Sequence, residues 1–234
     1  MAVDCDEVKS GLEPKGVDVN YSNLLEILEN LNQKQILLHQ DYILLGSWAL
    51  VIYAKKNNLE LGDRGIGRKT SDIDLLTKID MVSYLSESEL DIKLSDANTP
   101  YLGTVLNGND FFIEFFTPEA LKDIQGKEGK DLIDRIIEAS EDVQVNGFKI
   151  KVCPEYLWLG LKLSAWDKTH DEKHRHDIFY FRGLVGDKTF EAYLQKLQEI
   201  NPKYRTIADS LYNKLDGKQT SLDDFKKAKR RVRN

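Results

Sequence analysis

The chain has 234 residues, of which 41% are hydrophobic and 31% are charged, and its formal net charge is −6. This composition is typical of a globular protein of one or two domains and excludes a fibrous or disordered chain. The apolar runs are shorter than the ~20 residues of a membrane span, and the acidic first residues are unlike a secretory signal. Cys5 and Cys153 are too few for a disulfide scaffold or a four-cysteine zinc site. We therefore expect a cytoplasmic protein with no membrane partner.

Positive charge is concentrated near the C-terminal end. Residues 226–233 carry six Lys and Arg side chains, and without them the net charge of the chain is −12. Such an acidic body does not offer a general surface for nucleic acid, whereas the basic segment has the composition to contact a phosphate backbone. A solvated helix end is the simpler interpretation of the segment, because cations stabilise the C-terminus of a helix.

The first elements alternate between helical and strand patterns. We expect an acidic flexible arm over residues 1–18, a first domain over 19–152 and a helical domain over 153–234. The spacing of apolar residues predicts the first five elements of the chain. These are a helix from Tyr21 to Leu38, a strand over Tyr42–Leu45 that ends at Gly46, a helix capped by Ser47 and reaching Asn58, a loop over 59–70 and a strand over Ser71–Leu76.

Further strands complete the first domain. A short helix near Met81–Glu87 is followed by strands over Tyr101–Leu106 and Phe111–Phe116, with a turn over Asn107–Asp110 between them. The clearest local pattern is a hairpin over residues 143–152. There, Asn146-Gly147 supplies the positive φ angles of a type I′ turn.

Helical patterns dominate after Cys153. They cover 154–166, 171–185, 187–200, 203–214 and 221–231, and Pro154 suits the start of the first of these helices. Strands followed by helices predict an α+β protein, with a mixed β-sheet flanked by helices and then a C-terminal helical bundle. Trp48, Trp158 and Trp166 lie at helical spacing among apolar residues, so we expect them in the core.

Three acidic residues interrupt apolar strands. Asp72 and Asp74 are two positions apart in a strand, so their side chains project from the same face. Glu114 is a lone acid in the run from Phe111 to Phe116. Burying carboxylates side by side is unfavourable unless a divalent cation such as Mg²⁺ neutralises them. If the two strands are neighbours, the three carboxylates converge on one metal site. Otherwise they are ordinary solvent-facing strand positions.

The surroundings of these acids resemble a known family. An apolar strand, the turn Gly46-Ser47, a helix and the element Arg68-x-Thr70-x-Asp72-x-Asp74 resemble the nucleotidyltransferase superfamily that includes DNA polymerase beta. Within it, the pattern is most similar to the AbiEii-type abortive-infection toxins and their minimal relatives. Glu114 matches the family's third carboxylate. The segment 161–165 resembles the family's lysine-bearing helix, and 173–177 resembles its Lys-Asp-x-x-Asp helix start, with a histidine where an acid is usual.

This resemblance implies a function and a site. The first domain would be a nucleotidyltransferase catalytic domain that transfers a nucleoside monophosphate from a nucleoside triphosphate (NTP) to a hydroxyl acceptor and releases pyrophosphate. Two Mg²⁺ ions would be held by Asp72, Asp74 and Glu114. The nucleotide would be held by Gly46, Ser47, Arg68, Thr70, Lys162 and Lys173. The acceptor would be an RNA 3′ end, a protein or a small molecule, and the toxin relatives add an antitoxin-like protein as a candidate partner.

Two other functions stay open. The first is a nucleotide-binding or partner-binding module that has lost catalysis. The second is a metallohydrolase built on His170, His174 and His176, because the first two have the i, i+4 spacing of zinc ligands on one helix. Surface or packing histidines are the simpler interpretation. Residues 62–70 nearly match a P-loop, but an arginine separates the glycine from the lysine and a strand follows. A loop whose basic residues reach phosphate fits the segment better than a P-loop, and a solvated surface loop is the simpler interpretation.

Overall fold

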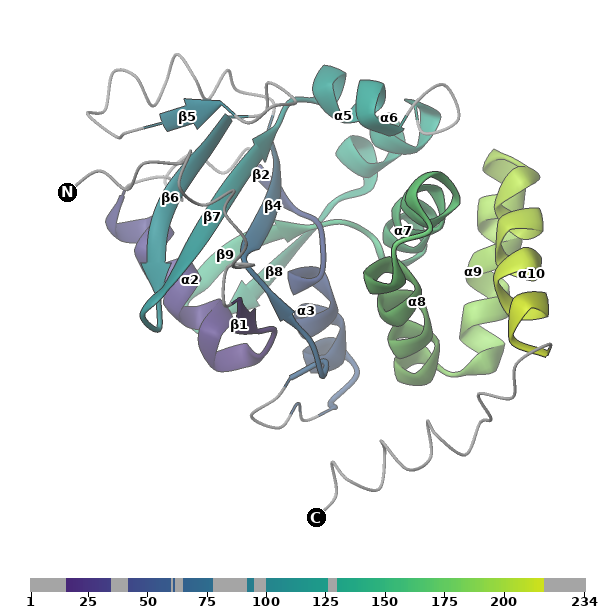
Figure 1. Cartoon of the computed structure of the whole chain (residues 1–234), viewed down its shortest axis with the longest axis horizontal. Helices are drawn as coiled ribbons and strands as arrows, with labels where there is room; N and C mark the ends of the chain where they lie inside the picture. Colours follow the sequence, from purple (N-terminus) through teal and green to yellow (C-terminus); the bar gives the residue numbers. More distant parts are fainter. Residues whose placement is uncertain are drawn as a thin grey trace.

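Residues 16–34, 42–59, 61, 65–77, 92–94, 100–125 and 130–216 are described by the computed structural model of the chain. They form the predicted α+β fold, in which a mixed β-sheet is followed by helices (Figure 1). The sheet has seven strands in the order β5-β6-β7-β4-β2-β9-β8. In that order, the strands are Ile92–Leu94, Pro100–Leu106, Asn109–Phe116, Asp72–Thr77, Tyr42–Leu44, Phe148–Val152 and Glu141–Val145.

The centre of the sheet brings together strands that are distant in sequence. Strand β4 is parallel to β7 on one side and antiparallel to β2 on the other, and β2 is parallel to β9. Because side chains alternate along a strand, Ile73, Leu75 and Ile113 lie on one face and are fully buried in the core. The intervening residues of β4 and β7 therefore belong to the opposite face, which carries the acids.

Two helices pack on the buried face. Helix α2, Tyr21–Gln33, begins at Asn20, whose side chain accepts a hydrogen bond from the backbone N–H of Asn23. Its predicted continuation to Leu38 enters residues 35–41, which lie outside the described part of the chain. Helix α3, Trp48–Lys56, is buried along almost its whole length, and the ring of Trp48 meets that of Phe111 edge-on at 6.0 Å.

Hairpins join the antiparallel pairs. Strands β8 and β9 form the predicted hairpin, with φ angles of 47° at Asn146 and 88° at Gly147. Asn107 and Gly108, with φ angles of 51° and 73°, make the same kind of turn between β6 and β7. Both turns place an Asn-Gly pair in the conformation that such pairs favour, so local sequence alone specifies these connections.

The second half of the chain is helical. Helices α5, Pro118–Gln125, and α6, Lys130–Ala139, precede the last hairpin and are not among the predicted elements. Helices α7, α8, α9 and α10 agree with four predicted helices and lie together on one side of the sheet (Figure 1). They span Glu155–Thr169, Glu172–Val185, Asp187–Ile200 and Lys203–Asp216. The predicted helices near 81–87 and 221–231 fall outside the described residues.

The end of the predicted acidic arm is part of the fold. Val17–Asp18 form strand β1, which pairs with β3, Lys69–Thr70, just before the acidic strand β4. Residues 17 and 18 are therefore not flexible, because backbone hydrogen bonds and the burial of Val17 fix them. Residues 1–15 lie outside the described residues. In the part of the chain that the structure describes, no helix is both long and apolar enough to cross a membrane.

Candidate active site

The acidic residues meet on neighbouring strands. In the register of β4 and β7, Asp74 is paired with Glu114, and Asp72 is paired with Phe112. Directly paired residues project to the same face of a sheet, so Asp72, Asp74 and Glu114 share one face. The strand adjacency on which the sequence argument depends is therefore present. All three side chains are half-buried.

Burial and mutual repulsion perturb two of these carboxyl groups. Burial raises the pKa of Asp74 to about 7, and the charges of Asp72 and Glu114 add to the effect, while Lys162 and Lys173 oppose it. Burial and the charge of Asp72 raise the pKa of Glu114 to about 6, and Lys173 again opposes the shift. The site thus holds more negative charge than its lysines neutralise.

The turn before α3 lies against Asp74. Gly46 has a φ angle of 59°, and a Cβ atom at this position would lie 2.1 Å from Oδ2 of Asp74. Both the backbone conformation and the close approach require glycine. Two indole N–H groups hold the surroundings: Trp158 donates to the carbonyl of Gly46, and Trp48 donates to the carbonyl of Asp72, each at 2.7 Å. These tryptophans are buried as predicted, and they also fix the backbone of the site.

Ser47 occupies the N-cap position of α3 without acting as a cap. Its side chain makes no hydrogen bond to the backbone of the helix. The hydroxyl instead donates to Oδ2 of Asp177 at 2.9 Å, from a position 130 residues away in the chain. The prediction that the Ser47 side chain caps α3 is therefore wrong. The backbone N–H groups of the first helical turn remain directed outward, as at the N-terminus of any helix.

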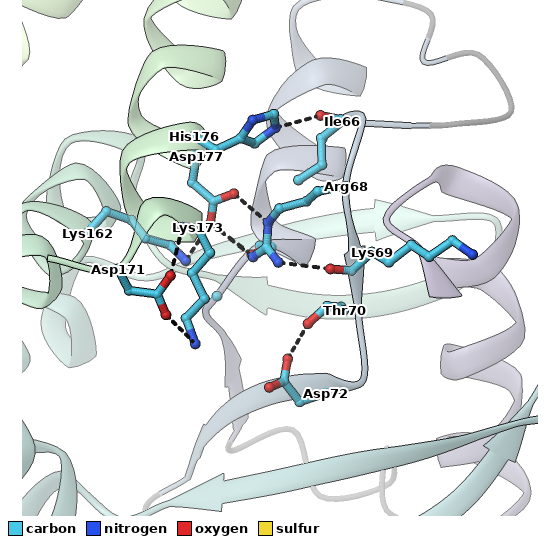
Figure 2. A network of polar contacts seen from close by, with 12 residues as sticks. Ile66, Arg68, Lys69, Thr70, Asp72, Lys162, Asp171, Lys173, His176 and Asp177 are labelled. Carbon is cyan, nitrogen blue, oxygen red and sulfur yellow. Dashed lines mark hydrogen bonds and ion pairs between the residues drawn. The ribbon is translucent and has the colours of Figure 1, made fainter. Parts of the chain in front are cut away.

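A buried carboxylate joins the other expected nucleotide-binding residues (Figure 2). Arg68 donates to Asp177 through Nε at 2.8 Å and Nη2 at 3.2 Å, and Lys162 Nζ lies 2.7 Å from Oδ2 of the same residue. The Arg68 guanidinium also donates to the hydroxyl of Ser47. Burial alone would raise the pKa of Asp177, but the adjacent charges of Lys162 and Arg68 hold it well below its usual range. Asp177 is thus an anion with satisfied partners.

The remaining expected residues differ in accessibility. The Lys173 side chain is 54% exposed and lies 3.5 Å from Asp171, whereas those of Arg68 and Lys162 are only 16% and 10% exposed. The Thr70 hydroxyl donates a hydrogen bond to Asp72 and so orients that carboxylate (Figure 2). Among these basic residues, Lys173 is best placed to reach a ligand from solvent.

The carboxylates suit a hard divalent cation. Among the described residues, no three Asp, Glu, His or Cys side chains are already gathered into a metal site. Nevertheless, Asp72, Asp74 and Glu114 offer oxygen ligands on one face, and burial together with the neighbouring carboxylates raises the pKa values of Asp74 and Glu114. A cation bound between them would relieve that repulsion, and oxygen ligands are those that Mg²⁺ prefers.

The three histidines do not share a helix. His170 ends α7 in the left-handed conformation, with a φ angle of 53°, whereas His174 lies in α8. A zinc-ligand pair with this spacing requires both histidines on one helix, one turn apart. His170 and His174 do not meet this requirement. His176 contacts the backbone carbonyl of Ile66 at 3.0 Å (Figure 2). Burial lowers the pKa of His174 to about 4, with Lys162 and Lys173 contributing.

The glycine-rich loop is anchored on two sides. The N–H of Ile66 donates to the carbonyl of Val19, and the N–H of Val19 donates to the carbonyl of Arg68. On the other side, His176 and Asp177 of α8 hold Ile66 and Arg68. The loop continues into strand β3 rather than into a helix, so the segment is not a P-loop.

Sequence reasoning missed the role of Asp177. A signal was available, because Lys162 lies inside an apolar helix, and a buried lysine needs a carboxylate partner. The sequence offers several acids within one helix of Lys162, and Asp177 is the one that the fold pairs with it. The contact of His176 with Ile66 had no such signal, since it joins a side chain to the backbone of a distant loop.

Two solved structures are similar in fold to this chain, at low sequence identity. No protein-family model matches the chain, and no curated protein matches it in sequence. One similar structure is the crystal structure of an antigenic nucleotidyltransferase-like protein from Paracoccidioides brasiliensis, with 17% identity and a TM-score of 0.48 over 83% of this chain and 94% of that one. Another is the solution structure of the antibiotic-resistance factor ANT(2'')-Ia, with 11% identity and a TM-score of 0.43 over 84% of this chain and 97% of that one. Both TM-scores are below 0.5, so an activity has to be argued from the site itself.

Proposed function

We propose that this chain is a divalent-metal-dependent nucleotidyltransferase. It would transfer a nucleoside monophosphate from an NTP to a hydroxyl acceptor and release pyrophosphate. The observation that carries the proposal is the register of β4 and β7, which pairs Asp74 with Glu114 and sets Asp72 on the same face. This acidic face lies directly against the Gly46 turn at the start of α3.

The turn and Lys173 suit the triphosphate. The N-terminus of α3 directs backbone N–H groups and the positive end of the helix dipole outward, an arrangement that binds phosphate. We assign Gly46 and Ser47 to phosphate binding through their backbone, because the Ser47 hydroxyl is already bonded to Asp177. Lys173, with its exposed side chain, would contact the phosphates as a point charge. Arg68 and Lys162 would hold the site in place through their ion pairs with the buried Asp177.

The carboxylates suit the reacting end of the nucleotide. Asp72, oriented by Thr70, and Asp74 would bind two Mg²⁺ ions together with Glu114. Such ions, when bound, neutralise charge on the transferred phosphoryl group and align the attacking and leaving oxygens. Glu114 would accept the proton of the acceptor hydroxyl at its carboxylate, because it lies on the same face as the two aspartates and next to Asp74.

A labelling experiment tests this activity. The protein would be incubated with each NTP, labelled at the α-phosphate, together with Mg²⁺ and the RNA, protein or small-molecule fraction of a cell extract. We expect one nucleotide to label one fraction, with no labelling by Asp74→Asn. Asp110→Asn should give full labelling, because Asp110 is an exposed acid on the same face of the neighbouring strand β7. Labelling by Asp74→Asn at the wild-type rate would contradict the proposal.

The finer assignment to an AbiEii-type toxin is a separate proposal, supported by the sequence motifs. It would make the chain a growth inhibitor whose activity an antitoxin-like protein restrains. Expression of the wild type should then arrest growth, whereas expression of Asp74→Asn at the same level should not. Equal growth of the two cultures would contradict the toxin assignment and leave the transferase proposal intact.

A further inference from the structure

The N-terminal strand β1 runs along the segment that leads into the acidic strand β4. Val17 of β1 is paired with Thr70 of β3, and the N–H of Val19 donates to the carbonyl of Arg68 at 3.1 Å. Strands β1 and β3 form a two-stranded sheet of their own, separate from the seven-stranded sheet that contains β4. Among the strands that the structure describes, β1 alone is paired with β3 and supports its backbone.

The supported segment carries two residues of the candidate site. The side chain of Arg68 reaches the buried Asp177, and the Thr70 hydroxyl donates a hydrogen bond to the carboxylate of Asp72 (Figure 2). A hydrogen-bond donor to a metal-binding carboxylate fixes its orientation, and loss of such a donor typically lowers metal affinity about tenfold or more. The position of the Thr70 backbone therefore affects how Asp72 is presented.

Two glycines allow the N-terminal segment to cross this part of the chain. A Cβ atom on Gly65 would overlap the carbonyl oxygen of Val19, and one on Gly16 would lie 2.7 Å from the carbonyl oxygen of Thr70. A side chain at either position would push the two backbones apart, because backbone atoms cannot rotate away as the end of a flexible side chain can. Gly65 of the glycine-rich loop is thus required by the contact between two chain segments.

Strand β1 is itself held by the rest of the first domain. Val17 and Val19 are buried in the core. The side-chain amide of Asn23 in α2 donates to the carbonyl of Asp18 at 2.7 Å, and its Oδ1 accepts a hydrogen bond of 2.7 Å from the amide of Asn107. Strand β1 therefore connects α2 and the turn between β6 and β7 to the segment that precedes β4.

We propose that strand β1 is a positioning element of the candidate site, which fixes Thr70 and, through the Thr70 hydroxyl, the carboxylate of Asp72. Gly16 and Gly65 are then positioning residues, because they let β1 lie close enough to pair with β3. This inference rests on the proposed function, in which Asp72 binds the metal ions that accompany the nucleotide. It adds residues of the N-terminal segment, which none of the sequence motifs include, to those on which nucleotide binding depends.

Glycine variants test whether this crossing affects the site. Each variant would be titrated with the four NTPs in the presence of Mg²⁺, and its free energy of unfolding would be measured by chemical denaturation. We expect Gly65→Ala to bind the NTP about tenfold more weakly than the wild type. The control is Gly67→Ala in the same loop, which should bind like the wild type. Gly67 also has a positive φ angle, 78° against 56° for Gly65, but a Cβ atom there would meet no atom within 4 Å.

A double-mutant cycle tests whether β1 acts through Thr70. Thr70→Val removes the hydroxyl and keeps the shape of the side chain, whereas Thr70→Ser keeps the hydroxyl and should bind the NTP like the wild type. We expect Gly16→Ala to weaken binding about tenfold in the wild type and to have almost no further effect in Thr70→Val, because the hydrogen bond to Asp72 is already absent there. A merely structural role of β1 would give the same loss in both backgrounds.

The outcomes separate this inference from the proposed function. Equal affinity of Gly65→Ala and Gly67→Ala, or an equal effect of Gly16→Ala in both backgrounds, would overturn the inference while the proposed function stands. If Gly65→Ala does not fold, the cycle built on Gly16→Ala decides the question. If the wild type binds no NTP with Mg²⁺, the proposed function fails, and the inference fails with it.

Discussion

The carboxylate of Asp177 and the ammonium group of Lys162 form an ion pair of 2.7 Å between α8 and α7, with Asp177 fully buried and the Lys162 side chain 10% exposed. Arg68 and Ser47 bond to the same carboxylate. One residue of the helical half thus fixes three residues of the candidate site, which come from the turn before α3, the loop before β3 and helix α7. The helical half is therefore part of the site and does not merely flank it.

Removal of the Asp177 charge should destabilise the whole protein. In Asp177→Asn, the charges of Arg68 and Lys162 would stay buried without their counter-ion, and breaking such a pair costs about 3 kcal/mol or more. Chemical denaturation would measure the loss. The matched control is Asp171→Asn, a nearby and more exposed aspartate whose side chain is 44% exposed. Equal stability of the two variants would show that the buried network does not hold the fold together.

The acids should make stability depend on pH. The pKa of Asp74 is about 7 in the folded protein, against an ordinary value of 3.8, so the folded state holds the extra proton and loses stability as the pH rises through this range. We expect the free energy of unfolding of the metal-free wild type, relative to that of Asp74→Asn, to fall by on the order of 2 kcal/mol between about pH 4.5 and 7.5. Mg²⁺ should reduce the fall.

The comparison with Asp74→Asn isolates this effect. The neutral form of His174 is favoured in the fold, with a pKa of about 4, so its contribution to stability rises with pH over part of the same range. That contribution is common to both proteins and cancels in the difference. A difference that stays flat with pH would mean that the pKa of Asp74 is not raised in the folded protein.

Gly46→Ala should disrupt the site more than the fold. A positive φ angle costs an alanine about 1 kcal/mol, and the new methyl group would also displace the Asp74 carboxylate. Gly108→Ala supplies the control, because Gly108 has a φ angle of 73° but no atom within 4 Å of a Cβ there. We expect similar backbone costs in both variants and loss of Mg²⁺-dependent nucleotide binding in Gly46→Ala alone. If Gly46→Ala binds the nucleotide as the wild type does, the turn before α3 is not part of the nucleotide-binding site.

Lys173→Gln should weaken nucleotide binding without loss of stability. Lys173 is exposed, so its replacement leaves no buried charge unpaired, while one contact to the triphosphate disappears. We expect the dissociation constant for the NTP to rise about tenfold, by analogy with a charge-assisted hydrogen bond. Lys188→Gln, an exposed lysine of α9, should bind like the wild type. If the affinity of Lys173→Gln for the NTP is unchanged, Lys173 does not contact the triphosphate.

Features specified by nearby residues were predictable from the sequence. The Asn146-Gly147 hairpin and the helices α7 to α10 follow from local turn chemistry and apolar spacing. The shared face of Asp72 and Asp74 follows from their separation by two positions. Helix α5 was not predicted, although the pair Thr117-Pro118 is typical of the start of a helix. In the structure, the Thr117 hydroxyl accepts a hydrogen bond from the backbone N–H of Ala120.

Features that depend on distant pairs were not predictable in the same way. The sequence shows that the three acids meet if β4 and β7 are neighbours, but no local pattern selects the neighbour of a strand. The structure supplies that pairing. The Ser47 hydroxyl has the chemistry of a helix cap, but it donates its hydrogen bond to a carboxylate 130 residues away. Likewise, the interval between His170 and His174 suggests one helix, whereas the chain changes direction between them.

The proposed function requires that Asp72 and Asp74 hold a nucleoside triphosphate together with Mg²⁺. Calorimetric titration of each of the four NTPs, with and without Mg²⁺, measures this binding. The wild type should bind at least one NTP only when Mg²⁺ is present, the double variant Asp72→Asn/Asp74→Asn should not bind it, and Asp110→Asn should bind it normally. If the folded wild type binds no NTP, or the double variant binds as tightly as the wild type, the claim is contradicted.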